Sequence, residues 1–212
     1  MTGGPTTGRA ARLALTARLA TAHRAVELLD RKQRALAIEC ERLELAAARA
    51  AKEFEQAAQV ASSWLRRSTA LDGQRGMHAS MPAAITEVTI GYDVTMGVRH
   101  PTRTEVHFAV QPEPAGSSAL DYAIDAHRKA LVAAVRLAAV QRAVTLVADE
   151  LGLTRQQQRA LELRWIPKLD RRLAELVQRL DETEREENVR LRWAASHAAR
   201  SAAAVVPDGE DR

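Results

Sequence analysis

The sequence is poor in the residues that build a compact enzyme core or a disulfide framework. Of its 212 residues, 3% are aromatic, and Cys40 is the single cysteine. One cysteine permits no disulfide within the chain and no cysteine metal cluster. So few aromatic side chains are unusual for a globular enzyme core. Residues 1–12 lack the apolar run of a signal peptide, and we see no run of about 18 apolar residues that would span a membrane. We therefore expect a cytoplasmic or peripheral protein.

Glycine and proline are concentrated in one part of the chain. Five of the ten glycines lie in residues 73–116, and four of the seven prolines lie in residues 82–114. The long spans on either side contain only Gly152 and Pro167. Because these residues interrupt helices, their distribution predicts five regions. We expect flexible tails at 1–8 and 204–212, coiled-coil helices at 9–72 and 119–203, and a loop and β-hairpin segment at 73–118.

Apolar side chains in both helical spans recur in alternating steps of four and three residues. This period of 3.5 is typical of the contact seam of a left-handed coiled coil. The first span alone would be about 95 Å long at about 1.5 Å per residue, which predicts a rod. Two such spans on one chain most simply fold back on each other. The predicted fold is therefore mainly α, a long antiparallel two-helix coiled coil with a small β-hairpin insert between the helices. The principal seam positions are Leu15, Leu19, Val26, Leu29, Leu36, Leu43, Phe54, Leu137, Val144, Ile166, Leu169, Leu173, Leu176 and Leu180.

The insert contains two stretches that alternate between apolar and polar residues. One runs over residues 88–96 and the other over 104–110, and we expect residues 97–103 to connect them as a long loop. An isolated hairpin is marginally stable in water, so its apolar face should pack on the helices, on a partner, or on both. The side chains assigned to that face are Val88, Ile90, Val106 and Phe108. We expect His100 and His107, in or near the loop, to be solvated.

Residues 149–163 carry the one ambiguous motif. A short helix, a Leu-Gly-Leu-Thr turn and a helix rich in Gln and Arg would be typical of a helix-turn-helix. The alternative is one continuous helix that tolerates Gly152 at a cost of about 1 kcal/mol. We favour the continuous helix because the flanking residues keep the coiled-coil seam. Pro167 removes one helical hydrogen bond and predicts a kink.

No constellation for catalysis or metal binding is recognisable. The histidines lack metal-ligand spacing, and there is no nucleophile motif. Gly3 and Gly8 have the spacing of a phosphate loop, but Arg9 and Ala10 follow where that loop needs lysine and a hydroxyl residue. We therefore assign no catalytic residue, no cofactor and no metal, and expect no enzyme activity from the chain alone.

Charge is mildly positive overall and more one-sided near the N-terminus. The formal net charge is +4, and residues 9–34 carry seven basic side chains against Glu27 and Asp30. This end could face an acidic partner or nucleic acid. A basic coiled-coil or helix-turn-helix protein that binds nucleic acid is therefore the alternative to a coiled-coil protein that binds other proteins.

Several short strings in the two helical spans occur in the order found in one family. Near the N-terminus they are Pro5-Thr6, Arg18-Leu19 with Ala22, and Leu28-Leu29 followed by Arg31-Lys32 and Ala35-Leu36. Near the C-terminus they are Ala160-Leu161-Glu162, Ile166-Pro167 and residues 184–192. On these strings the chain resembles the D subunit of V-type (archaeal or vacuolar-type) ATPases and ATP synthases over nearly its whole length. Asp30 and Arg192 depart from the family pattern.

The resemblance implies the rotor shaft of a central stalk, which couples proton or sodium transport to ATP synthesis or hydrolysis by rotation. The implied partners are the catalytic and non-catalytic subunits of a hexameric head, the small F subunit of the stalk and a protein that docks on the membrane ring. No nucleic acid and no direct membrane insertion are implied, and the location would be peripheral, on the cytoplasmic side. Both chain ends would lie inside the head and the hairpin would face the stalk partner. The side chains we expect to face the head are Arg9, Arg12, Arg18, Arg185, Arg190 and Arg192.

Overall fold

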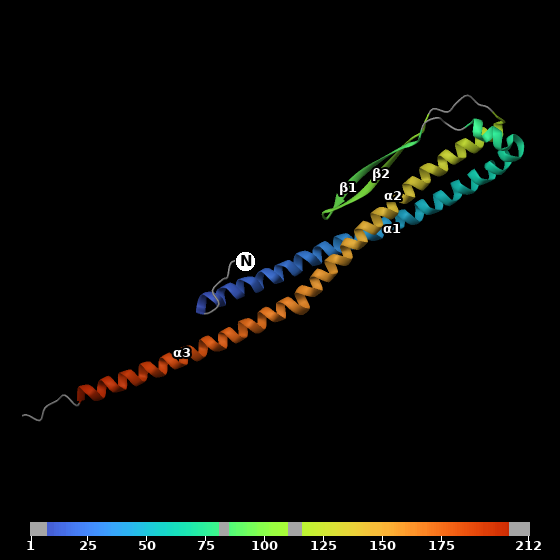
Figure 1. Cartoon of the computed structure of the whole chain (residues 1–212). Helices are drawn as coiled ribbons and strands as arrows, with labels where there is room; N and C mark the ends of the chain where they lie inside the picture. The colour runs from blue at the N-terminus through green and yellow to red at the C-terminus, as the bar shows by residue number, and fades with distance from the viewer. Residues whose placement is uncertain (1–7, 81–84, 110–115, 204–212) are drawn as a thin grey trace, which may run out of the picture. The chain divides into compact units, whose positions relative to one another are not determined.

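The computed structural model describes residues 8–80, 85–109 and 116–203 (Figure 1). Its elements are α1 (Gly8–Ala79), β1 (Glu87–Thr95), β2 (Val98–His107), α2 (Ser118–Ala160), the π-helix η1 (Leu161–Trp165) and α3 (Ile166–Ala203). The chain is thus a long helix, a two-stranded antiparallel hairpin and a second long helical stretch, which confirms the predicted fold class. The predicted tails lie outside the described residues, except that Gly8 begins α1.

Two compact units make up the chain. The terminal unit comprises Met1–Leu28 and Gln158–Arg212, and the central unit comprises Leu29–Gln157. The terminal unit therefore combines the start of α1 with the end of α2, η1 and α3. The central unit combines the remainder of α1 with the hairpin and most of α2.

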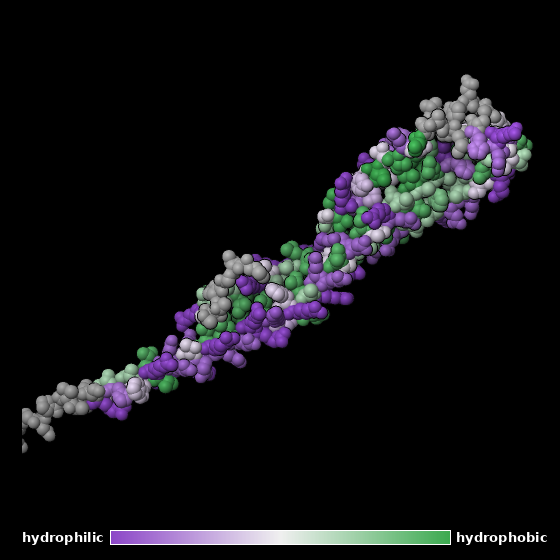
Figure 2. All heavy atoms as spheres, in the orientation of Figure 1, coloured by the Kyte–Doolittle hydropathy of each residue, from purple (hydrophilic) through white to green (hydrophobic). Residues whose placement is uncertain are grey.

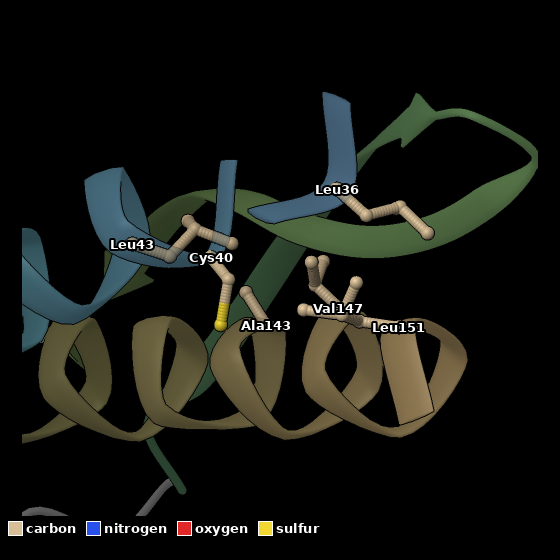
Figure 3. Close-up of a cluster of buried hydrophobic side chains, with 6 residues drawn as sticks. All are labelled: Leu36, Cys40, Leu43, Ala143, Val147 and Leu151. Carbon is tan, nitrogen blue, oxygen red and sulfur yellow. The ribbon is translucent and has the colours of Figure 1, made fainter. Parts of the chain in front are cut away.

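In the central unit, α1 and α2 lie side by side and antiparallel. The ion pairs fix the direction, because Lys32 on α1 pairs with Glu150 at 2.5 Å while Glu53, further along α1, pairs with Arg136, earlier on α2, at 3.2 Å. Between these pairs the two helices share a buried cluster that also contacts Val98 of β2. The cluster consists of Leu36, Cys40, Leu43, Ala143, Val147 and Leu151 (Figure 3). Burying a leucine side chain of this kind contributes about 2 kcal/mol.

Alanine fills the second contact between the same helices. Ala61 on α1 and Ala126 and Ala130 on α2 are buried together, with Ala57 and Trp64 packed against them. Small side chains let helix axes approach closely, so this contact depends on shape rather than on large apolar area. The ring of Trp64 stacks on that of Tyr122, with centroids 4.8 Å apart.

Every principal seam position is at least half-buried. The most deeply buried are Leu36 and Leu43 in the central unit and Leu169 and Leu176 in the terminal unit. The remaining positions are half-buried: Leu15, Leu19, Val26, Leu29, Phe54, Leu137, Val144, Ile166, Leu173 and Leu180. That the two units share one uninterrupted seam stays a prediction.

The first helix breaks at the predicted glycine and then resumes. Gly73 has φ 62° and ψ −175°, outside the helical region, yet residues beyond it are helical as far as Ala79. The first part of the predicted loop and β-hairpin segment, 73–118, is therefore helical up to Ala79. Asp72, just before the break, accepts hydrogen bonds from the backbone N–H of Ser117 at 2.8 Å and from its hydroxyl at 2.5 Å. Ser117 thus binds α1 just before the break at Gly73, and its own carbonyl accepts the N–H of Leu120 at the start of α2.

The hairpin turns much earlier than the sequence indicates. Thr95 pairs with Val98, so Met96 and Gly97 form a two-residue turn, and both have positive φ, 50° and 85°. Positive φ at both central residues defines the type I′ turn favoured by twisted hairpins. The long loop predicted at residues 97–103 is therefore wrong, since these residues belong to β2. The alternating pattern was hidden at Pro101, which pairs with Tyr92. The register shift lies between this pair and the pair of Gly91 with Arg103, so β2 has one extra residue there.

The second long helix runs through the ambiguous motif without a turn. α2 is continuous from Ser118 to Ala160 across Gly152, which confirms the continuous helix over the helix-turn-helix. The departure from α-helical geometry comes afterwards, in the π-helix Leu161–Trp165. Pro167 has no N–H to donate to the carbonyl four residues earlier, so the preceding turn adopts another hydrogen-bonding pattern. π-turns are among the known causes of helix kinks, so η1 is consistent with the kink predicted at Pro167, which itself stays a prediction.

By length and composition, one helix among the described residues could cross a membrane. The stretch Ser118–Ala198 contains an 18-residue window with a mean hydropathy of 1.7, of which 11% is buried. The expectation that no unbroken run of about 18 apolar residues exists is unaffected, because the window passes on mean hydropathy alone. Alanine, valine and leucine dominate part of α2 despite Arg136 and Arg142, so the average is high although no unbroken apolar run occurs. The same helix packs Ala143 and Val147 against α1.

Replacing Leu43 by aspartate should destabilise the protein strongly, and the same change at Leu45 should not. Leu43 is 4% exposed in the α1–α2 cluster, whereas Leu45 on the same helix is 63% exposed. An unpaired carboxylate buried among apolar side chains costs several kcal/mol. We expect Leu43→Asp to lower the melting midpoint, followed by circular dichroism, by about 10 °C. Equal melting of the two variants would show that the buried cluster does not hold the helices together.

Candidate functional site

His100 fixes the hairpin to the first helix of the central unit. Its side chain is 1% exposed, with Nε2 3.1 Å from the hydroxyl of Thr95 and 4.0 Å from Oε1 of Glu39 on α1. Residues 98–107 form a strand rather than a loop, and β2 directs this imidazole towards α1. The expectation of a solvated His100 is therefore wrong, whereas His107, with 62% of its side chain exposed, is solvated as expected.

The carboxylate that faces His100 is held ionised by its neighbour on the same helix. Arg42 donates two hydrogen bonds to Glu39, from Nε at 2.8 Å and from Nη2 at 2.6 Å. The bonds from Arg42 lower the pKa of Glu39, with a smaller contribution from His100, while burial and Asp93 oppose this shift. The same pairing raises the pKa of the Arg42 guanidinium. Glu39 is therefore a fixed negative charge beneath the hairpin.

The hairpin turns most of its apolar face away from its own helices. Val88 pairs with Val106, Ile90 with Thr104 and Tyr92 with Pro101, so these residues share one face. Val88 and Ile90 are 43% and 42% exposed, and Tyr92 and Val94 are also exposed. Figure 2 shows hydrophobic residues gathered on the visible face of the central unit beside the hairpin. Of the four residues assigned to the apolar face, only Val106 and Phe108 are half-buried.

An apolar cavity lies where the base of the hairpin meets the two helices of the central unit. Its volume is about 430 Å³. Phe108 lines it together with Leu65 of α1 and Ile124 of α2. The guanidinium of Arg128 lies 5.3 Å from the centroid of the Phe108 ring. His127 also lines the cavity, and its Nδ1 lies 2.8 Å from the carbonyl oxygen of Ala123.

In the terminal unit all six predicted head-facing arginines are exposed. Arg9 pairs with Glu184 at 3.0 Å, Arg185 with Glu182 at 3.3 Å and Arg190 with Glu186 at 3.5 Å. Pairs as exposed as these contribute about 1 kcal/mol at most and are screened by salt. The remaining three arginines are Arg12, Arg18 and Arg192. The structure therefore offers a charged surface whose local pairs can be exchanged at little cost.

The terminal unit also exposes large apolar side chains that the sequence patterns did not single out. Val189, Leu191 and Trp193 are all more than 60% exposed. Trp193 contacts the ring of His197, with centroids 4.2 Å apart. Val189 and Trp193 are four residues apart, which places them on one helix face. That spacing was visible in the sequence but was hidden by the dense charge of residues 182–192.

The part of the chain that the structure describes offers no metal site. No group of three or more His, Cys, Asp and Glu side chains within it could hold a metal ion. Cys40 is buried, and burial together with its contact to Glu44 raises the pKa of the thiol, which disfavours the reactive thiolate. Buried helix contacts, exposed charge and an exposed apolar sheet face define the class as a helical coiled-coil protein with a hairpin insert.

Comparison with known proteins places the chain within that class. A family model that describes the D subunit of ATP synthase matches residues 11–196. The chain therefore belongs to the family of ATP synthase D subunits, which confirms the resemblance seen in the sequence. Members of this family are stalk subunits of rotary ATPases.

One similar protein is the D subunit of the A-type ATP synthase of Methanopyrus kandleri. It is 38% identical to this chain over 76 residues, which is 36% of the chain and 33% of the relative. The matched region thus spans about a third of that relative's length.

Acidification should weaken the hairpin contact through Glu39. The pKa of this carboxyl is lower in the folded chain than in the unfolded chain, so its contribution is full above the unfolded pKa. That contribution is lost as the pH falls through the folded pKa. We expect Glu39→Gln to lower the melting temperature at pH 7. Between pH 7 and pH 3, the melting temperature of this variant should fall less than that of the parent. Glu41→Gln, an exposed neighbour, is the control, and a fall as steep in Glu39→Gln as in the parent would contradict the assignment.

Proposed function

We propose that this chain is the central-stalk rotor shaft of a V-type ATP synthase or ATPase. It couples proton or sodium transport across the membrane to ATP synthesis or hydrolysis in the catalytic head by rotation. The observation that carries the proposal is the family match over residues 11–196, which includes both long helical stretches and the hairpin. The antiparallel contact of α1 and α2 supports it, because paired helices resist bending and twisting better than one helix.

The shaft itself is non-catalytic in this proposal. The chain has neither the lysine of a phosphate loop nor a nucleophile motif, so catalysis belongs to other subunits. Its partners are the catalytic and non-catalytic subunits of the hexameric head, the small F subunit of the stalk and the protein that docks on the membrane ring. It is attached peripherally, through the complex, on the cytoplasmic side of the membrane.

The surface of the terminal unit suits a bearing. A rotating shaft must break its contacts with the head and remake them at each step, so deep apolar contacts alone would hold it in one position. Exposed ion pairs such as Arg9–Glu184 can be exchanged for pairs with the head at little cost. The helix-turn-helix form of the nucleic-acid alternative loses its support, because α2 is continuous where a helix-turn-helix would need a turn.

Copurification tests the proposal directly. The tagged chain should bring down ATPase head subunits, and the purified chain should hydrolyse no ATP. Adding it to a head that lacks it should restore hydrolysis coupled to rotation. Recovery of the chain without any head subunit, or hydrolysis by the chain alone, would overturn the proposal.

Removing positive charge from the N-terminal arm should reduce coupling without unfolding the protein. Arg9, Arg12 and Arg18 are exposed, so alanine at all three should leave the melting midpoint nearly unchanged. Because each exposed pair is weak, single replacements should have little effect, while the triple variant should lower assembly or torque. The measurement is ATP-driven rotation at low and high salt. If the triple variant rotates and assembles like the parent at both salt concentrations, torque is transmitted by the shape of the shaft rather than by these charges.

A further inference from the structure

The edge of β1 that faces away from β2 is not paired with any other strand in the part of the chain that the structure describes. Within the described residues the sheet contains only β1 and β2. Every residue of β1 is at least partly exposed, whereas β2 buries His100 and Pro101. A two-stranded sheet is marginally stable, and an exposed strand edge is a template for pairing with another chain.

The direction of the free backbone groups follows from one hydrogen bond. The N–H of Val94 donates to Oδ1 of its neighbour Asp93 at 2.8 Å, so it points away from β2. In an antiparallel pair, alternate residues direct their N–H and C=O groups outward. Counting back from Val94, the alternate residues of β1 are Tyr92, Ile90 and Val88. Their backbone N–H and C=O groups therefore also point away from β2. The open edge therefore runs over residues 88–92. It ends at Val94, whose outward N–H already donates to the carboxylate of Asp93.

The same three residues supply both the outward backbone groups and the exposed apolar face. A strand added at this edge would gain hydrogen bonds from Val88, Ile90 and Tyr92 and would continue their apolar face sideways. The opposite edge of the sheet is less suitable. Pro101 has no N–H, and the register shift disrupts the regular spacing of β2. Only one edge of the hairpin is thus suited to pairing.

Charge indicates what kind of strand fits. The other face of β1 carries Glu87 and Asp93 and no basic residue. Opposite charges directly across a strand pair stabilise it, and like charges destabilise it. A second copy of β1 paired antiparallel about Ile90 would place Glu87 opposite Asp93. Self-pairing is therefore disfavoured, and a strand with lysine or arginine at alternate positions is favoured.

We propose that the β1 edge binds an extended segment of a partner protein as a third strand, with apolar and basic side chains in alternation. The apolar side chains of that segment lie beside Val88, Ile90 and Tyr92, and its basic side chains face Glu87 and Asp93. This proposal goes beyond the rotor function and does not depend on it. The strand pairing and the rotor function can therefore fail independently of each other.

The test is amide hydrogen exchange of the full chain with a short synthetic peptide of alternating lysine and valine. The peptide should slow exchange at Val88, Ile90 and Tyr92, whose N–H groups point outward. Thr89 and Asp93, whose N–H groups face β2, should not change. A peptide of alternating glutamate and valine should have no effect. Absence of protection by the lysine peptide, or equal protection by both peptides, would overturn the proposal.

Two variants at one position separate backbone pairing from side-chain contact. Ile90→Ala removes the side chain and keeps the N–H, while Ile90→Pro removes both. Proline at an outward position leaves the bonds to β2 in place, which unchanged exchange at Thr89 would verify. We expect Ile90→Pro to weaken peptide binding about tenfold more than Ile90→Ala. Equal weakening would mean that no strand is added. Protection that appears without peptide as the chain concentration rises would mean that the occupant is a second copy.

Discussion

The close contact of α1 with α2 is the interaction on which the central unit depends. Leu36, Cys40 and Leu43 pack against Ala143, Val147 and Leu151, and Val98 of the hairpin lies against the same cluster. A pair of helices has no thick core, so each buried side chain contributes a large share of the free energy of folding. The small side chains of Ala61, Ala126 and Ala130 keep the pair close at the second contact, with Trp64 packed against them.

The hairpin depends on that contact in an unusual way. It approaches the helices with a polar residue, His100, which lies against Glu39 and Thr95 rather than among apolar side chains. Buried polar groups give less stability than apolar ones but specify one orientation, since an unpaired polar group costs free energy in every other arrangement. The anchor therefore determines which face of the hairpin is left outside, and that face is the apolar one.

Much of this architecture is predictable from the sequence, because helical spacing and helix-breaking residues are local signals. The steps of three and four residues indicated the paired helices, and Gly73 indicated the break in α1. The position of the hairpin turn was missed, because a type I′ turn at Met96-Gly97 lacks the usual Asn or Asp before glycine. The burial of His100 was missed as well. It depends on Glu39, which lies 61 positions earlier in the sequence, and no local pattern reports such a contact.

The buried position of Cys40 has a practical consequence for anyone who wishes to watch this molecule move. Its thiol is covered by the α1–α2 contact, and its raised pKa keeps it protonated at neutral pH. Maleimide dyes react with thiolates at the surface, so this natural cysteine should stay largely unlabelled. A fluorophore or a bead can then be attached through one engineered surface cysteine, without first deleting the native one and disturbing the packing around it.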